Sequence, residues 1–351
     1  STAHSWIAGH RARNASLAMR AGARNDKKEL ASREIVWWFI GGLLLASAVS
    51  VFFAADKSLA LFKFSWLMLG VGLFWVAVKA DYSRWKLVWS LLVGLGMQAG
   101  LAIWQFLSQT SFENKWLGLA LHNAADLGVS VIETVGADGM GERWLRAYGG
   151  LDHPNILGGV LAIGILLLIG QIITREQTNN FQFLIFKMTA WIFLVIFSAA
   201  LFFSFSRAAW LALAGGLAVM LGGAAIKKNL AAQKNILPAV LIIGLIFFIL
   251  WFQLPNLILT RLYVDGRLEN KSKNERLESI KNSWPVIKKS WAAGVGIGNY
   301  TLALKRDRPE RESFYYQPVH DVYILIFSEI GIVGFILFIC LQLPQMRRLH
   351  T

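Results

Sequence analysis

The sequence predicts an all-α polytopic membrane protein, with about eight transmembrane helices and a large loop that contains an amphipathic helix. Of its 351 residues, 56% are hydrophobic and only 16% are charged, whereas soluble domains average about 45–50% and about 25%. Several long runs carry almost no charge, which is not expected of a soluble enzyme. The single cysteine, Cys340, excludes an intrachain disulfide framework and a cysteine-based zinc cluster.

Each predicted transmembrane helix is an apolar run long enough to cross about 30 Å of hydrocarbon at about 1.5 Å per residue. The runs occupy residues 35–54, 60–78, 87–107, 156–173, 184–203, 209–226, 236–254 and 322–343. Only Ser204–Arg207 separates the fifth run from the sixth, so we expect a tight helical hairpin there. The fourth and sixth runs are rich in Gly and Ala, which permits close helix approach in lipid.

Basic residues indicate how these helices are oriented. Residues 1–34 and the short loops after the second and sixth runs are basic, whereas the short loops on the opposite side carry few Lys and Arg residues. This bias predicts that residues 1–34 are cytoplasmic and that the two longer loops, 108–155 and 255–321, lie on the far side. The same pattern argues against nucleic acid as the partner of the +14 net charge. Because the chain starts at Ser1 without Met, we expect a fragment that lacks helices at both ends.

The loop 255–321 contains the predicted amphipathic helix, from Glu275 to Trp291. Its apolar stripe has the 3,4 spacing of a helix and consists of Leu277, Ile280, Trp284, Ile287 and Trp291. We expect Pro285 to kink or interrupt this helix, Gly294–Asn299 to end it, and the helix to lie against the membrane surface or the helix bundle. The loop also holds twelve Lys and Arg residues, which suits a polyanionic partner such as a diphosphate or a phosphorylated lipid.

Ionisable residues at the membrane edge are candidates for function, because a charge in lipid is costly unless it is paired or used. Arg207 lies between two apolar runs, although an interfacial arginine that extends to the headgroups is an equally good interpretation. His320 opens the last run and can act as a general base, with Asp321 orienting it. The alternative is an ordinary polar helix start, with Asp321 near the positive end of the helix dipole. Glu329 lies deeper in the same run and must face protein or water.

Other candidates are weaker from the residues alone. Arg276 opens the amphipathic helix, but composition alone favours a solvated loop charge. His153 starts the fourth run, and Asn155 is a candidate helix cap. Two histidines and scattered acids without fixed spacing do not indicate a metal site, so we expect no metal. The sequence also lacks Walker, dinucleotide-binding and serine-nucleophile motifs, so we expect no nucleotide cofactor and an energy-rich substrate that arrives from the lipid.

Four segments, in this order, resemble the O-antigen ligase and O-antigen polymerase superfamily of bacterial inner-membrane glycan-assembly proteins. They are Asp152–Asn155; Phe205–Trp210; Glu275–Arg276 with Trp284 and Gly294–Tyr300; and His320 with Gly331 and Gly334. The spacing from His320 to the two glycines matches the ligase pattern of His, a polar residue, nine residues and then Gly-x-x-Gly. The resemblance covers most of residues 35–343.

The resemblance implies a helical bundle with a periplasmic active site and no metal or nucleotide requirement. It implies a glycan donor on undecaprenyl diphosphate and, for the ligases, transfer to lipid A-core with inversion at the anomeric carbon. His320 matches the essential loop histidine and Arg207 the arginine that opens a span, while Arg276 is our match for the loop arginine. The remaining residues expected to bind substrate are Arg261 and Arg267, which are rivals of Arg276, together with Asp321, Asn155, His153 and Tyr300.

Two departures from the ligase pattern leave the acceptor open. Asp321 stands where ligases commonly have Asn, Ser or Gln, and Phe335 stands where they continue with Thr or His. A polymerase that extends one lipid-linked glycan with another, or a protein oligosaccharyltransferase, would use the same chemistry. A transporter is the alternative from another class, with Arg207, His320 and Glu329 lining an anion path or proton relay. Against transport, these candidates gather at one membrane face, and the large basic loop has no role in it.

Overall fold

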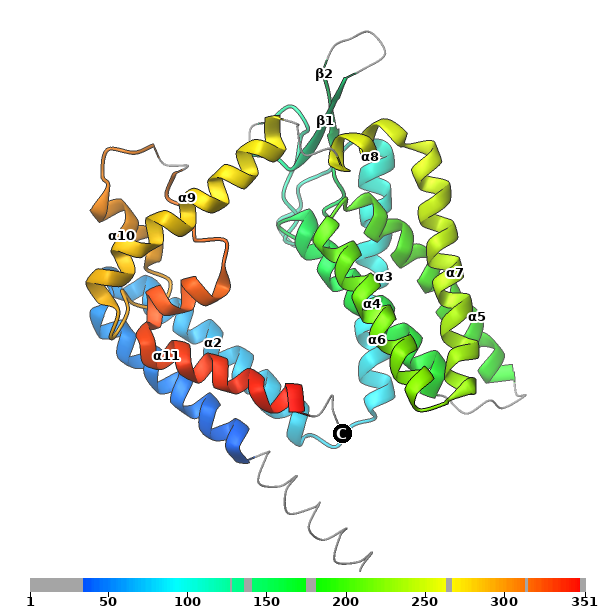
Figure 1. Cartoon of the computed structure of the whole chain (residues 1–351), viewed down its shortest axis with the longest axis horizontal. Helices are drawn as coiled ribbons and strands as arrows, with labels where there is room; N and C mark the ends of the chain where they lie inside the picture. The colour runs from blue at the N-terminus through cyan, green and yellow to red at the C-terminus, as the bar shows by residue number, and fades with distance from the viewer. Residues whose placement is uncertain are drawn as a thin grey trace, which may run out of the picture. The chain divides into compact units, whose positions relative to one another are not determined.

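A computed structural model gives the fold of residues 34–126, 128–135, 141–174, 181–262, 267–312 and 315–347. Within these ranges, eight helices are long and apolar enough to cross a membrane (Figure 1), which confirms the all-α polytopic fold. They are Glu34–Phe53, α2 (Lys57–Lys79), α3 (Arg84–Ser108), α4 (Pro154–Thr174), α5 (Phe181–Phe203), α6 (Arg207–Ile226), α7 (Leu230–Gln253) and α11 (Val322–Arg347). Except for Glu34, the predicted cytoplasmic segment 1–34 lies outside the described residues.

Shorter elements occupy the two longer loops. The loop after α3 contains strands β1 (Val131–Val135) and β2 (Gly141–Leu145), which pair antiparallel and which the sequence analysis did not anticipate. In Figure 1 this hairpin projects beyond the ends of the neighbouring helices, and α8 (Pro255–Leu262) packs against β1. Next come α9 (Arg267–Ser290) and α10 (Tyr300–Asp307). The predicted amphipathic helix therefore exists, and it starts eight residues before Glu275.

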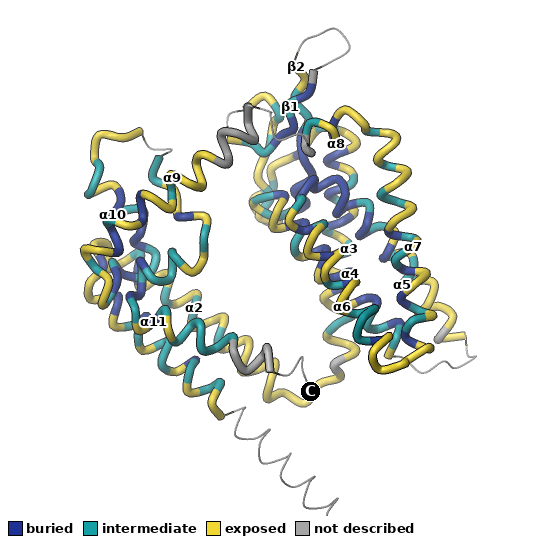
Figure 2. The backbone as a smooth tube through the Cα atoms, viewed as in Figure 1, coloured by how far each residue is buried: buried dark blue, intermediate teal, exposed yellow. Residues whose placement is uncertain are grey.

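The chain divides into two compact units, here called unit 1 (residues 1–80 with 272–351) and unit 2 (residues 81–271). In unit 2, α4 is the central helix and packs against α3, α5, α6 and α7. It is apolar on all sides, as expected for a helix surrounded by others, and buried residues follow its length (Figure 2). A tight connection between α5 and α6 is confirmed, because only the turn Ser204–Ser206 separates them.

In unit 1, α11 contains a break at Gly331, whose backbone is left-handed (φ 70°, ψ −174°). The glycine turn, residues 294–299, inserts at this break. The N–H groups of Val295 and Gly296 donate to the carbonyls of Ser328 and Glu329 at 2.9 and 3.0 Å, and Ile332 N–H donates to the Trp291 carbonyl at 2.9 Å. The break thus exposes helical backbone groups that the turn satisfies, as a membrane-buried segment requires.

Side chains reinforce the same junction. The Glu329 carboxylate accepts hydrogen bonds from the backbone N–H groups of Gly298 (2.8 Å) and Tyr300 (3.4 Å). Asn299 is fully buried and exchanges two hydrogen bonds with the Asp56 backbone, at 2.8 and 3.2 Å. The glycine turn is therefore tied both to α11 and to the start of α2. Glu329 faces protein backbone, which is one of the two environments that the sequence analysis allowed.

Pro285 lies inside α9 and does not interrupt it. Of the two predicted effects, the interruption is therefore wrong, and the kink stays a prediction. The following residues, Val286 and Ile287, are buried, and this packing holds the last turn despite the missing Pro285 N–H. The helix ends at Ser290, whose carbonyl accepts the Gly294 N–H at 2.8 Å. The glycine turn therefore follows the end of α9, near the position predicted. Of the predicted apolar stripe, only Ile287 is buried; Leu277, Ile280, Trp284 and Trp291 are exposed.

We expect Gly294→Ala to destabilise unit 1 by at least about 2 kcal/mol. Gly294 has a positive φ (75°), and an added Cβ would clash with the Glu329 carbonyl oxygen, a backbone atom that cannot rotate away as a side chain can. Thermal unfolding of the purified protein in detergent measures the effect. Gly72→Ala, in α2, is the matched control, because its Cβ would meet nothing within 4 Å. An unchanged unfolding temperature for Gly294→Ala would contradict this account of the junction.

Candidate active site

Arg207 is the first residue of α6 and directly follows the turn Ser204–Ser206. Phe205 in this turn has a left-handed backbone (φ 47°), and its N–H donates to the Phe202 carbonyl at 2.9 Å. Ser206 occupies the N-cap position without a side-chain capping bond. Arg207 is half-buried, and it lies at the positive end of a membrane-length helix. Such a position favours an anionic group.

An aromatic cluster fixes this turn. Phe205 is fully buried, Phe203 stacks on Phe106 with ring centroids 4.3 Å apart, and Phe202 stacks on Trp210 at 5.5 Å. The Trp210 indole N–H also donates to the Leu201 carbonyl at 3.1 Å, which links the first turn of α6 to the last turn of α5. The aromatic residues of the Phe205–Trp210 segment therefore hold Arg207 in place.

His153, not Asn155, caps α4, so the predicted cap is corrected. The helix begins at Pro154, and the His153 Nδ1 accepts the Asn155 N–H at 3.0 Å, while the His153 carbonyl accepts from Ile156 and Leu157. Capping geometry depends on the residue that precedes the first helical turn, and Pro at the first position shifts that residue to His153. Asn155 is instead exposed in the first turn. Substrate binding by His153 and Asn155 stays a prediction.

Arg146 is a buried cation next to these elements, and it is not among the residues predicted from the sequence. Its side chain is held by hydrogen bonds to the Ser204 carbonyl, to Ser130 Oγ and to Asn155 Oδ1, at 2.8, 2.7 and 2.8 Å. The residue is only 3% exposed. No local pattern distinguishes Arg146 from other loop arginines, since its partners come from three separate segments, one of them 58 residues away.

His320 is exposed and lies two residues before the start of α11, in unit 1. The neighbouring Asp321 caps this helix, because its Oδ1 accepts the N–H groups of Tyr323 and Ile324 at 2.9 and 3.0 Å. The carboxylate of Asp321 thus has a structural role, as the simpler interpretation of this helix start suggested. Its predicted role in orienting the His320 imidazole stays a prediction.

A small apolar cluster supports the segment that carries His320. The adjacent Val319 is buried together with Val286, Tyr300 and Leu304. The chain before it is held by Arg308, which donates to Tyr315 Oη at 2.9 Å and whose carbonyl accepts from Tyr316 Oη at 2.6 Å. The backbone that carries His320 is therefore held on both the cluster side and the preceding segment. Tyr300, which we expected to bind substrate, is only 1% exposed and packs in this cluster.

The loop arginines lie on helices. Arg276 is exposed on α9. Arg261 and Arg267 lie in α8 and α9, and their side chains are outside the part that the structure describes. By units, Arg276, Tyr300, His320 and Asp321 belong to unit 1, whereas Arg207, His153, Asn155, Arg261 and Arg267 belong to unit 2.

A cavity of about 350 Å³ in unit 1 is lined by none of the predicted site residues. Its walls include Phe53 and Val286, and Lys289 pairs with Asp307 at its edge. In the described ranges, no group of three or more His, Cys, Asp or Glu side chains could hold a metal ion.

Residues 192–339 match the sequence model of a family described as O-antigen ligase. This segment of the chain is therefore similar to the O-antigen ligase family. This match confirms the resemblance to the O-antigen ligase and polymerase superfamily, and it contains Arg207, Arg276, Tyr300 and His320. Neither a curated protein nor a solved structure matches the chain. The family supports a lipid-linked glycan transferase in a multi-pass membrane protein, and therefore an enzyme rather than a transporter.

The Tyr300 hydroxyl allows a test of the apolar cluster that packs beneath the His320 segment. Its hydroxyl is buried without a hydrogen-bond partner among the described residues, so Tyr300→Phe removes an unsatisfied polar group. Burial, with a smaller contribution from Tyr315, raises the pKa of Tyr300 from 10.0 to about 12. Above a pH of about 10, the unfolded chain therefore releases this proton while the folded chain keeps it, and stability is lost as the pH rises.

We expect Tyr300→Phe to be at least as stable as the original protein at pH 7, and to be increasingly the more stable of the two between pH 10 and about 12. Urea unfolding of both proteins at pH 7 and pH 11 measures the difference. A Tyr300→Phe protein that is less stable at pH 7 by more than about 1 kcal/mol would show that the hydroxyl has a partner.

Proposed function

We propose that the chain is an O-antigen ligase that transfers a glycan from undecaprenyl diphosphate to lipid A-core at the periplasmic face of the bacterial inner membrane. The observation that carries this proposal is the family match over residues 192–339. That range includes Arg207 and His320, two residues of chemically suitable type. Arg207 is the first residue of α6, and His320 lies two residues before the start of α11; both helices are long enough to cross a membrane. The basic short loops predicted to be cytoplasmic support the periplasmic assignment of both positions.

His320 is the proposed general base. Its exposed imidazole is free of the helix-capping bonds that engage Asp321, so it is available to a substrate. It takes the proton from the acceptor sugar hydroxyl as that oxygen forms a bond to the anomeric carbon of the donor. The bond from the anomeric carbon to the diphosphate oxygen breaks at the same time, and attack from the opposite face inverts the anomeric centre.

Arg207 and Arg276 are the proposed diphosphate ligands. Undecaprenyl diphosphate leaves as an anion, and guanidinium groups stabilise developing negative charge by charge-assisted hydrogen bonds. The uncapped start of α6 adds a favourable dipole next to Arg207. Arg261 and Arg267 remain alternative donors of the second guanidinium. A diphosphate leaving group already present in the donor makes a nucleotide unnecessary, and the mechanism invokes no metal.

We expect His320→Ala to reduce transfer by about 10²–10⁴-fold, the usual contribution of a general base. The measurement uses purified protein in lipid nanodiscs with undecaprenyl-diphosphate glycan and EDTA, with and without lipid A-core. Gln317→Ala is the matched control, because Gln317 is also exposed on the segment before α11. His320→Ala protein with normal transfer would remove the histidine from the mechanism.

The same assay separates the candidate acceptors. Glycan attached to lipid A-core, formed only when this acceptor is present, identifies a ligase. Longer lipid-linked glycan formed without lipid A-core identifies a polymerase instead. The absence of both products, from protein shown to be folded, would overturn the proposed function.

A further inference from the structure

Arg146 connects three segments of unit 2 that are far apart in the sequence. It directly follows strand β2, and its guanidinium donates from Nε to the Ser204 carbonyl, from Nη1 to Ser130 Oγ and from Nη2 to Asn155 Oδ1. The three oxygens belong to the turn before α6, to the residue before β1 and to the first turn of α4. Arg146 is only 3% exposed. Removing a cation from water costs free energy unless hydrogen bonds replace its hydration, and here the three oxygens supply them.

The contacts of Arg146 converge on the turn that presents Arg207. The adjacent residue, Ala147, donates its N–H to the Phe203 carbonyl at 3.1 Å, so residues 146–147 hold two consecutive carbonyls, those of Phe203 and Ser204. Ser204 Oγ in turn accepts the Ser206 N–H at 3.3 Å. A chain of hydrogen bonds therefore runs from Arg146 to the residue that precedes Arg207.

The start of α4 packs against the same turn. We call the contacts of Arg146 with this turn and with α4 the Arg146 clamp. A Cβ on Gly158 would lie 2.8 Å from Ser206 Cβ and 3.0 Å from Ala209 Cβ, so α4 and the start of α6 are in direct contact. Through its hydrogen bonds to Asn155 and to the Ser204 carbonyl, Arg146 connects the first turn of α4 to the turn Ser204–Ser206, which Gly158 also contacts. Because the guanidinium is planar with donors fixed in several directions, it can hold all three oxygens at once, which an ammonium cannot do with the same geometry.

We infer that Arg146 is a positioning residue for Arg207: by clamping the turn Ser204–Ser206 against the start of α4, it holds Arg207 where the donor diphosphate binds. The expected effect on transfer rests on the proposed function. The clamp itself can be tested without activity, by hydrogen exchange at the amides of the turn. Arg146 acts through Arg207 and does not touch the reacting atoms.

Hydrogen exchange of the full-length protein in nanodiscs tests the clamp independently of activity. In Arg146→Gln we expect faster exchange at the amides of residues 203–210, with α7 unchanged. Arg146→Lys keeps the charge but not the fork of donors, so its exchange at these amides should be intermediate. If Arg146→Gln does not fold, Arg146→Lys decides the matter. Unchanged exchange over 203–210 in the folded variant would overturn the inference.

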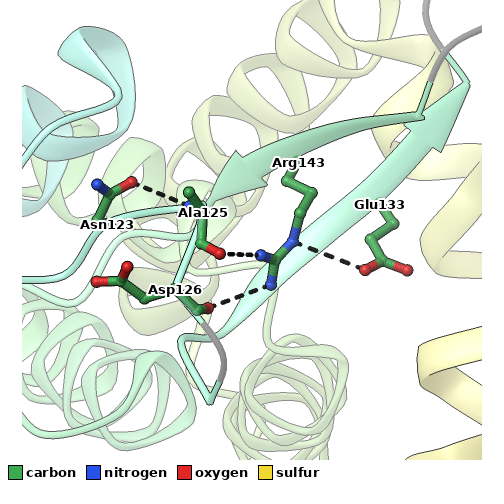
Figure 3. Close-up of polar contacts among 5 residues, drawn as sticks. All are labelled: Asn123, Ala125, Asp126, Glu133 and Arg143. Carbon is green, nitrogen blue, oxygen red and sulfur yellow. Dashed lines mark hydrogen bonds and ion pairs between the residues drawn. The ribbon is translucent and has the colours of Figure 1, made fainter.

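Arg143→Gln is the matched control. Arg143 lies three residues before Arg146 and also bonds to backbone carbonyls, those of Ala125 and Asp126, with Glu133 at 3.7 Å (Figure 3). The substitution removes one positive charge from the same β-hairpin. Because Arg143 contacts residues 125–133 and not the α6 turn, we expect unchanged exchange at 203–210 in this variant.

Transfer kinetics then test whether the clamp acts through Arg207. We expect Arg146→Gln to lower kcat/KM for the lipid-linked donor about tenfold or more, with KM for the acceptor unchanged. In an Arg207→Ala background the further fall should be less than about twofold, because the two residues then act on one interaction. Full additivity of the two substitutions would contradict the inference. The absence of transfer by the original protein would count against the proposed function alone, since the exchange result still decides the clamp.

Discussion

The break in α11 at Gly331 is the constraint on which unit 1 depends. A helix that crosses a membrane must satisfy its backbone polar groups internally, and an irregular stretch at that depth is tolerated only where protein supplies the partners. Here the partners are the N–H groups of Val295 and Gly296 and the carbonyl of Trp291. The approach is so close that a Cβ on Gly331 would lie 2.3 Å from the Ala292 carbonyl oxygen. The break at Gly331 and the glycine turn therefore depend on each other and form one junction, which we call the joint.

This joint determines where His320 can lie. The turn that fills the break leads directly into α10, whose Tyr300 and Leu304 pack with Val319, the residue before His320. Glu329 accepts N–H groups from Gly298 and Tyr300 and so holds the start of α10 to α11. The break at Gly331, eleven positions after the histidine, thus bears on His320 through packing. This gives a physical reason for the spacing between His320 and Gly331.

The transmembrane helices could be predicted because an apolar run of sufficient length has few alternatives, and each predicted run overlaps one observed helix. Arg207 and His320 could be named as candidates because they fall in segments whose pattern resembles the family's, not because ionisable residues at span boundaries are rare, since Lys57, Lys79 and Arg84 also lie at helix ends. Other features depend on partners remote in sequence. The burial of Arg146 needs Ser130, Asn155 and Ser204 to come together, and the cap of α4 depends on Pro154 starting the helix. The continuation of α9 through Pro285 depends on the burial of Val286 and Ile287, which local propensity does not reveal.

The support of Arg207 also shows why the family domain depends on the chain before it. The match begins at residue 192, yet the guanidinium that holds the turn before Arg207 belongs to Arg146, and the helix that this turn abuts is α4. In the proposed function, Arg207 stabilises the leaving group, and such stabilisation of charge requires groups that are already held in place. Within unit 2 that base is assembled from α4, the β-hairpin and the end of α5. The arginine that opens α6 therefore acts as part of the whole unit rather than of the matched segment alone.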